Sequence, residues 1–201
     1  MNPAMPKKEY AALIFDCDGT LTDSMPVHYV AWHRTMSGYG ISFPEDRFYA
    51  LGGMPSDKIV RLLAGEQGIL VDANRAATEK ENAFLTLIHL LEPILPVMAV
   101  AEHFRHKLPM AVASGGFREV VQQQLNQIGC GDWFDSVVAA EDTDRHKPEP
   151  DVFLEAARRV GVSPQRCLVY EDSDLGISAA KTAGMDYVDV RTFFSPKRIV
   201  V

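Results

Sequence analysis

The sequence predicts an α/β fold: a doubly wound parallel sheet with a helical domain inserted after the first strand. Two observations support this prediction. Short apolar runs alternate with helical patterns through the second half of the chain, an order typical of parallel sheets. In addition, about a hundred residues separate Asp16 from Ser114, whereas a strand–helix–strand unit needs only about 30. The excess residues are helical in pattern.

Five segments are predicted to be strands. The first follows from the apolar run Ala11-Ala12-Leu13-Ile14, which is typical of a strand buried on both faces. The later strands follow from similar apolar runs. In chain order the five segments are residues 11–17, 110–114, 136–140, 167–171 and 187–191.

Helices are predicted between the later strands, over residues 117–128, 151–160 and 174–182. A glycine follows each of them, at Gly129, Gly161 and Gly184. Glycine is common immediately after the last turn of a helix. The alternation of strands and helices therefore continues to about Arg191.

The long interval after the first strand is predicted to form a lid. Its candidate helices are residues 26–36, 56–65 and 73–91, and a glycine-containing turn at residues 51–55 interrupts the pattern. Because ligands bind at the carboxyl ends of the strands in such sheets, an insert at this position would cover the site. We expect a core domain of residues 1–22 and 93–201 and a helical cap of residues 23–92, with hinges near 22–24 and 92–96.

Composition narrows the possible partners. The chain has 201 residues and a formal net charge of −7, which argues against nucleic acid and against anionic membranes. Its three cysteines lack paired or metal-type spacing, so we expect reduced thiols and a cytoplasmic protein. Residues 1–10 lack the apolar stretch of a signal peptide, and no apolar run approaches the length of a membrane span. A monomer is expected.

Asp16 and Asp18 indicate the chemistry. They follow the first strand at positions i and i+2, so their side chains point the same way, and Gly19 permits a sharp turn after them. Two close carboxylates repel each other unless a cation lies with them. Mg²⁺ is held by carboxylates together with a phosphate, and a carboxylate can itself accept a phosphoryl group. The pattern therefore predicts Mg²⁺-assisted phosphoryl transfer.

Two further motifs agree with this chemistry. Ser114 and Gly115 follow a strand and precede a helix, where backbone N–H groups can hold a phosphate. Lys147 lies on a loop stiffened by Pro148 and Pro150 and could neutralise charge on the phosphate and on Asp16. The alternatives are structural or belong to another protein class. Asp16 and Asp18 could be surface acids at a turn or part of a phospho-acceptor receiver domain, and Lys147 could be an ordinary surface lysine.

These motifs resemble, in order, the four signatures of the haloacid dehalogenase superfamily. The match is the stretch Asp16-Cys17-Asp18-Gly19-Thr20, then Ser114-Gly115, Lys147-Pro148 and Glu171-Asp172. The nearest resemblance is to the beta-phosphoglucomutase-like branch and, within it, to bacterial sugar-phosphate phosphatases of the fructose-1-phosphatase type. A phosphorylated small molecule is therefore the expected substrate.

The resemblance implies roles for the core residues. Asp16 would attack phosphorus, and Asp18 would protonate the leaving oxygen and then activate water. Ser114, Gly115 and Lys147 would bind the phosphoryl group. The Mg²⁺ ligands would be Asp16, the backbone carbonyl of Asp18 and Asp172, while Glu171 would ligate the ion or orient its waters.

The cap offers two candidates for substrate contact, His28 and Lys58. Histidines lie at the position of His28 in the sugar-phosphate branch; the alternative is a histidine packed on a helix face beside Trp32. Lys58 would contact the substrate from the lid or lie on a solvated helix face.

A hexose-phosphate mutase is the alternative function. Related mutases carry a lysine and an arginine in the lid turn, at positions that align with Gly52 and Ser56. Neither residue is basic, so the second phosphate of a mutase cycle would lack its clamp. A non-enzymatic binding protein would have lost at least one of Asp16, Asp18, Lys147 and Asp172, and all four are present.

Overall fold

A computed structural model of the chain describes residues 2–197. Its centre is a five-stranded parallel sheet in the order β3-β2-β1-β4-β5. The α/β fold with a doubly wound parallel sheet is therefore confirmed. The strands are β1 (Ala12–Phe15), β2 (Met110–Ala113), β3 (Ser136–Val138), β4 (Cys167–Glu171) and β5 (Asp186–Asp189).

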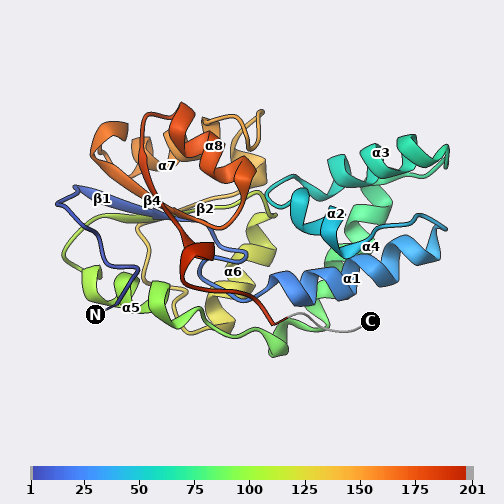
Figure 1. Ribbon diagram of the computed structural model, residues 1–201, viewed down its shortest axis with the longest axis horizontal. Helices are drawn as coiled ribbons and strands as arrows, with labels where there is room; N and C mark the ends of the chain where they lie inside the picture. Colours follow the sequence, from blue (N-terminus) through green and yellow to red (C-terminus); the bar gives the residue numbers. More distant parts are fainter. Residues whose placement is uncertain (1, 198–201) are drawn as a thin grey trace.

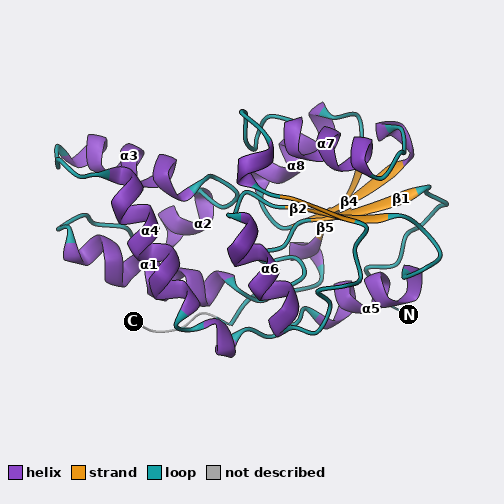
Figure 2. Ribbon diagram, turned by 180° about the vertical axis from the view of Figure 1, so that it is seen from behind, coloured by secondary structure: helices purple, strands orange, loops and turns teal. Residues whose placement is uncertain are grey.

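Alternating side chains of the central strands serve two separate apolar cores. Leu13 and Phe15 of β1 belong to a cluster completed by residues of α5 (Leu95–Phe104) and α6 (Arg118–Gln127). Ile14 points to the opposite face and packs with residues of α7 (Asp151–Arg159) and α8 (Asp174–Thr182). Figures 1 and 2 show the two helix pairs on opposite sides of the sheet. This double burial explains the continuous apolar runs in the sequence.

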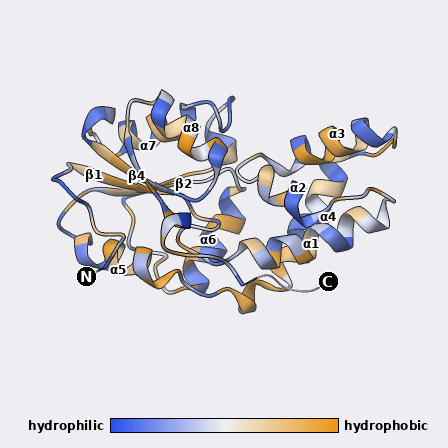
Figure 3. Ribbon diagram, viewed as in Figure 1, coloured by the Kyte–Doolittle hydropathy of each residue, from blue (hydrophilic) through white to orange (hydrophobic). Residues whose placement is uncertain are grey.

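The insert after β1 forms the expected helical cap. Its helices are α1 (Met25–Gly38), α2 (Glu45–Ala50), α3 (Ser56–Gln67) and α4 (Ala73–Leu85), and they lie beside the core in Figure 1. The cap has an apolar cluster of its own that includes Trp32, Met36, Phe48 and Leu63. Figure 3 shows apolar and polar residues alternating along α3, as expected for a helix with one buried face.

Helix positions agree with the sequence in most places. The bounds of β4 and α8 match the prediction, whereas the expected helix over 73–91 ends at Leu85 and is followed by a short 3₁₀ turn, Ile88–Leu90. Helices α2 and α5 were not predicted. Further 3₁₀ turns are Ala140–Asp142, Pro164–Arg166 and Val190–Thr192.

Two antiparallel linkers join the cap to the core. The Asp23 amide donates to the Glu92 carbonyl at 2.8 Å, and the Ile94 amide donates to the Leu21 carbonyl at 2.9 Å. These contacts lie where the sequence places the two hinges, although the domain boundaries themselves remain a prediction. The expected core domain includes residues 1 and 198–201, which lie outside the described residues.

No helix within residues 2–197 combines the length and the apolarity needed to cross a membrane.

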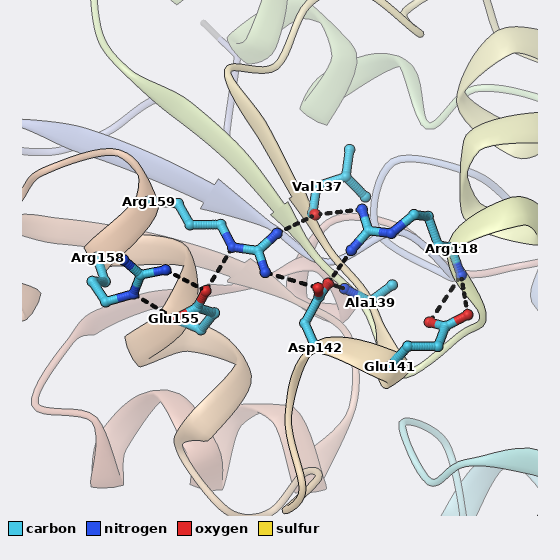
Figure 4. A network of polar contacts seen from close by, with 8 residues as sticks. All are labelled: Arg118, Val137, Ala139, Glu141, Asp142, Glu155, Arg158 and Arg159. Carbon is cyan, nitrogen blue, oxygen red and sulfur yellow. Dashed lines mark hydrogen bonds and ion pairs between the residues drawn. The ribbon is translucent and has the colours of Figure 1, made fainter.

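A cluster of charged side chains covers the exposed edge of β3 (Figure 4). Arg118 and Arg159 both donate to the Val137 carbonyl, at 2.9 and 3.1 Å, and both also contact Asp142. The Ala139 amide donates to Asp142 at 2.8 Å. Side chains thus occupy backbone groups that would otherwise be open to pairing with another strand.

We expect Arg159→Ala to lower the free energy of unfolding by about 1 kcal/mol, because the substitution removes bonds to the Val137 carbonyl and to the carboxylates of Asp142 and Glu155. Urea denaturation would measure the change. Arg158→Ala is the matched control, since the polar contacts of Arg158 within residues 2–197 go to Glu155 alone and its side chain is 71% exposed. Equal midpoints for the wild type and the Arg159 variant would contradict a stabilising role for the edge cluster.

Candidate active site

The first carboxylates of the site lie just beyond the end of β1. Asp16 and Asp18 both line one cleft between core and cap, as their i, i+2 spacing predicts. Cys17, between them, turns into the apolar core. Asp16 is buried, with 5% of its surface exposed.

Lys147 is buried between two carboxylates. Its Nζ donates to Asp16 Oδ1 and to Glu171 Oε2, each at 2.7 Å. Burial alone would lower the pKa of this ammonium, but Asp16 and Glu171 hold it above its usual range. The lysine is therefore charged in the site and bridges the ends of β1 and β4, which are neighbours in the sheet.

Glu171 organises the loop after β4. Its Oε1 accepts from the amides of Asp172 and Ser173 and from the Ser173 hydroxyl, at 2.8 to 3.1 Å. Ser173 caps α8 through a bond from the Gly176 amide. Because Oε2 is held by Lys147, both oxygens of Glu171 are engaged, which favours an orienting role over direct ligation of an ion.

Asp16, Glu171 and Asp172 fit a metal ion. Each places a carboxylate oxygen within 4.8 Å of the others. Burial, followed by repulsion from Glu171, raises the pKa of Asp16 to about 8 and that of Asp172 well above its usual range. One ammonium does not balance three carboxylates this close together, so a hard cation would stabilise their ionised forms.

Gly19 is required for this packing. Its φ is +77°, and a Cβ atom there would lie 2.1 Å from an oxygen of Asp172. Only glycine accommodates both the backbone conformation and the approach of the carboxylate. The glycine of the first motif thus lets the ends of β1 and β4 meet.

Ser114 and Gly115 lie beyond the end of β2 and line the same cleft. Ser114 is buried, and its Oγ accepts from the Gly116 amide at 3.0 Å. The structure therefore brings together the seven core residues of the sequence prediction. Six of them line the cleft, and the seventh, Lys147, is bonded to two of the six; the six are Asp16, Asp18, Ser114, Gly115, Glu171 and Asp172.

The cap reaches Asp18 directly. Ser24 donates its hydroxyl to Asp18 Oδ1 at 2.6 Å, and His28 Nε2 lies 2.7 Å from the same oxygen. Burial would raise the pKa of Asp18, but the contacts with His28 and Ser24 hold it below its usual range. Asp18 is therefore ionised in this arrangement, and His28 contacts the core carboxylate.

A buried group behind His28 was not predicted. Lys80 Nζ lies 2.9 Å from His28 Nδ1 and 3.1 Å from Glu81 Oε1, and Ser56 donates to the same Glu81 oxygen at 2.6 Å. Phe84 stacks on the His28 ring with a centroid distance of 3.7 Å. The sequence shows a helix here, but nothing in it marks Lys80 and Glu81 as buried.

Lys58 does not reach the cleft. It is exposed on α3 and is not among the residues that line the site. The cap lysine that does line the cleft is Lys80, on the adjacent helix α4. Of the two alternatives for Lys58, its exposure favours the solvated helix face, and contact with a substrate stays a prediction.

The cleft measures about 700 Å³, counting the part that is open to solvent. Its core side carries the carboxylates, whereas its cap side is largely apolar, with side chains that include Trp32, Phe48, Met54 and Ile59. The cap turn lies against the core: a Cβ on Gly115 would be 2.7 Å from the Gly53 carbonyl oxygen. The structure therefore has the cap resting on the core.

Buried carboxylates with a lysine at the carboxyl edge of a parallel sheet, under a helical cap, define a class of hydrolase. The family model of haloacid dehalogenase-like hydrolases matches residues 10–184. The chain belongs to this family, and the resemblance of its four motifs is confirmed.

Several characterised proteins are similar over most of their length. A fructose-1-phosphate phosphatase of Escherichia coli is 40% identical, covering 92% of this chain and 98% of the relative. A beta-phosphoglucomutase of Bacillus subtilis is 30% identical, covering 89% and 82%. The crystal structure of a beta-phosphoglucomutase from Clostridium difficile superposes with a TM-score of 0.81 at 26% identity, covering 90% of this chain and 84% of that one. The beta-phosphoglucomutase-like branch is therefore confirmed.

We expect Gly115→Ala to lower kcat/KM about tenfold or more, because the added methyl would hold the cap turn away from the core and misplace cap groups. Steady-state kinetics with a sugar phosphate would measure this. Gly65→Ala is the control, since a Cβ on this cap-helix glycine meets nothing within 4 Å. Wild-type kinetics for the Gly115 variant would show that the contact with Gly53 is dispensable.

We expect His28→Ala to lower kcat/KM about tenfold or more on both a sugar phosphate and p-nitrophenyl phosphate. The reason is that Asp18 loses the partner that orients it, and proton transfer contributes to turnover of either substrate. His33→Ala, an exposed position on the same helix, should have little effect. A loss confined to the sugar phosphate would instead assign His28 to sugar contact.

Proposed function

We propose that the chain is a Mg²⁺-dependent phosphatase that hydrolyses small sugar phosphates through an aspartyl phosphate on Asp16. The observation that carries this proposal is the buried contact of Asp16 with Lys147 beside Glu171 and Asp172, in the cleft that Asp18 also lines. Relatives named as phosphatases of fructose 1-phosphate, phosphorylated carbohydrates and hexitols support the substrate class.

In the first step, an oxygen of Asp16 attacks phosphorus as the bond from phosphorus to the sugar oxygen breaks. Lys147 already donates to Asp16 at 2.7 Å, so it opposes the effect of burial on the Asp16 pKa and offsets charge that develops on the phosphoryl group. Ser114 and the Gly115 amide would hold the other phosphoryl oxygens. The product of this step is an acyl phosphate on Asp16.

Asp18 would move the protons. Asp18 must first take up a proton when substrate binds, and it passes this proton to the leaving sugar oxygen; the carboxylate that results then takes a proton from the water that attacks the acyl phosphate. Ser24 and His28 hold its Oδ1 and favour the ionised form, which is the form that accepts a proton from water. Both contacts come from the beginning of the cap, so they depend on the cap lying against the core.

The cation we propose is Mg²⁺, held by Asp16, Asp172 and the backbone carbonyl of Asp18, with Glu171 orienting the loop. The buried carboxylate cluster supports a metal site. When bound, the ion would supply positive charge that gathers these carboxylates around a dianionic phosphate. We also propose that the protein is a cytoplasmic monomer and that its cap comprises residues 23–92.

A hexose-phosphate mutase is the second candidate, because beta-phosphoglucomutases are among the relatives. In such a cycle the aspartyl phosphate returns to sugar. The cap turn that faces the core carries Gly52, Gly53 and Ser56 rather than basic residues. The phosphatase is therefore the function that the site supports better.

A screen of phosphorylated metabolites with Mg²⁺, read out as released phosphate, would test the proposal. We expect turnover of sugar monophosphates by the wild type, no turnover in EDTA, and a loss of at least a thousandfold in Asp16→Asn, because an amide cannot accept the phosphoryl group. A folded Asp16→Asn protein with near-normal rates would remove Asp16 as the nucleophile. Rapid isomerisation of a hexose 1-phosphate with little free phosphate would favour the mutase.

A further inference from the structure

The charged groups on the cap side of the cleft form one connected set. Within the described residues, the ionisable side chains that the cap contributes to the cleft are His28, Lys80 and Glu81. The remaining cap side chains around them are apolar or small. Whatever part of a substrate extends beyond the phosphoryl group toward the cap must therefore be accommodated by these three groups.

Glu81 is a buried carboxylate held at one oxygen. Its Oε1 accepts from the Ser56 hydroxyl at 2.6 Å and from Lys80 at 3.1 Å, and its side chain is only 12% exposed. Burial would raise the pKa of Glu81, but Lys80 and His28 hold it below its usual range. The cap side of the cleft thus contains a fixed negative charge.

Lys80, the one lysine on the cap side of the described cleft, is fully engaged. Besides Glu81 it contacts His28 Nδ1 at 2.9 Å. Its ammonium also lies 5.2 and 5.5 Å from the ring centroids of Trp32 and Phe84, distances at which aromatic faces attract cations. The lysine is therefore already neutralised by groups of the protein and offers little charge to an anion.

We propose that Glu81 is a specificity-determining residue that restricts the enzyme to monophosphates whose far end is uncharged. This inference rests on the proposed function. A second phosphate directed toward the cap would meet a buried carboxylate and a lysine that is already paired, and close like charges in a desolvated site are costly. A sugar hydroxyl at the same place could instead donate to Glu81.

The test compares fructose 1-phosphate with fructose 1,6-bisphosphate, two probes that differ by one phosphate. Phosphate release with Mg²⁺ would give kcat/KM for each. We expect the wild type to prefer the monophosphate and Glu81→Gln to shift the ratio toward the bisphosphate about tenfold or more, because the substitution keeps the shape, removes the charge and frees Lys80.

Glu79→Gln is the matched control. Glu79 lies on the same helix but bonds Tyr39 and Arg75 on the outer side of the cap, so the ratio should not change. If Glu81 had a merely structural role, Glu81→Gln would lower kcat/KM for the monophosphate and for the bisphosphate together. The ratio of the two would then be unchanged, which would overturn the inference. Inhibition of the wild type by the bisphosphate provides a second measurement that does not depend on folding of the variant.

We expect the inhibition constant of the bisphosphate to exceed the KM of the monophosphate by about tenfold or more. Equal values would overturn the inference even if Glu81→Gln failed to fold. Wild-type protein that releases phosphate from neither sugar would overturn the proposed function and this inference with it. An unchanged ratio in an active Glu81→Gln protein overturns the inference alone.

Discussion

The rest of the site depends on one buried ion pair network, the ammonium of Lys147 between Asp16 and Glu171. Three carboxylates from two strand ends lie within a few ångströms of one another, and without a cation their repulsion would separate them or protonate them. Lys147 supplies one positive charge from a third segment of the chain. The remaining negative charge is what makes the cluster suited to a metal ion and, with it, to a phosphate.

A second set of contacts links the chemistry to the position of the cap. Ser24 and His28 lie at the start of α1, yet both contact Asp18 on the core. The paired linkers around Asp23 and Glu92 are the covalent connections between the two parts. Movement of the cap would therefore change the surroundings of the proposed acid and base as well as access of water to the site.

The core side and the cap side of the cleft differ in charge and therefore suit different parts of a substrate. The core side concentrates carboxylates around Lys147, so a cation and a phosphate suit it. On the cap side, Glu81 neutralises Lys80 within a mostly apolar wall, so an uncharged sugar suits it better than a second phosphate. A phosphatase of monophosphates and a mutase that cycles through a bisphosphate could thus share one core and differ in the cap.

The sequence by itself determined the sheet, the insert and the core site. Parallel strands end at one edge, so motifs that follow β1, β2 and β4 had to meet there. It did not reveal α2 or α5, nor that Lys80 and Glu81 of α4 are buried while Lys58 of α3 is exposed. Helical periodicity shows that a helix has two faces, but which face meets the cleft depends on packing between helices distant in sequence. Only the tertiary structure decided which cap charges line the cleft, because that choice rests on long-range contacts such as those of His28 with Lys80 and Ser56 with Glu81.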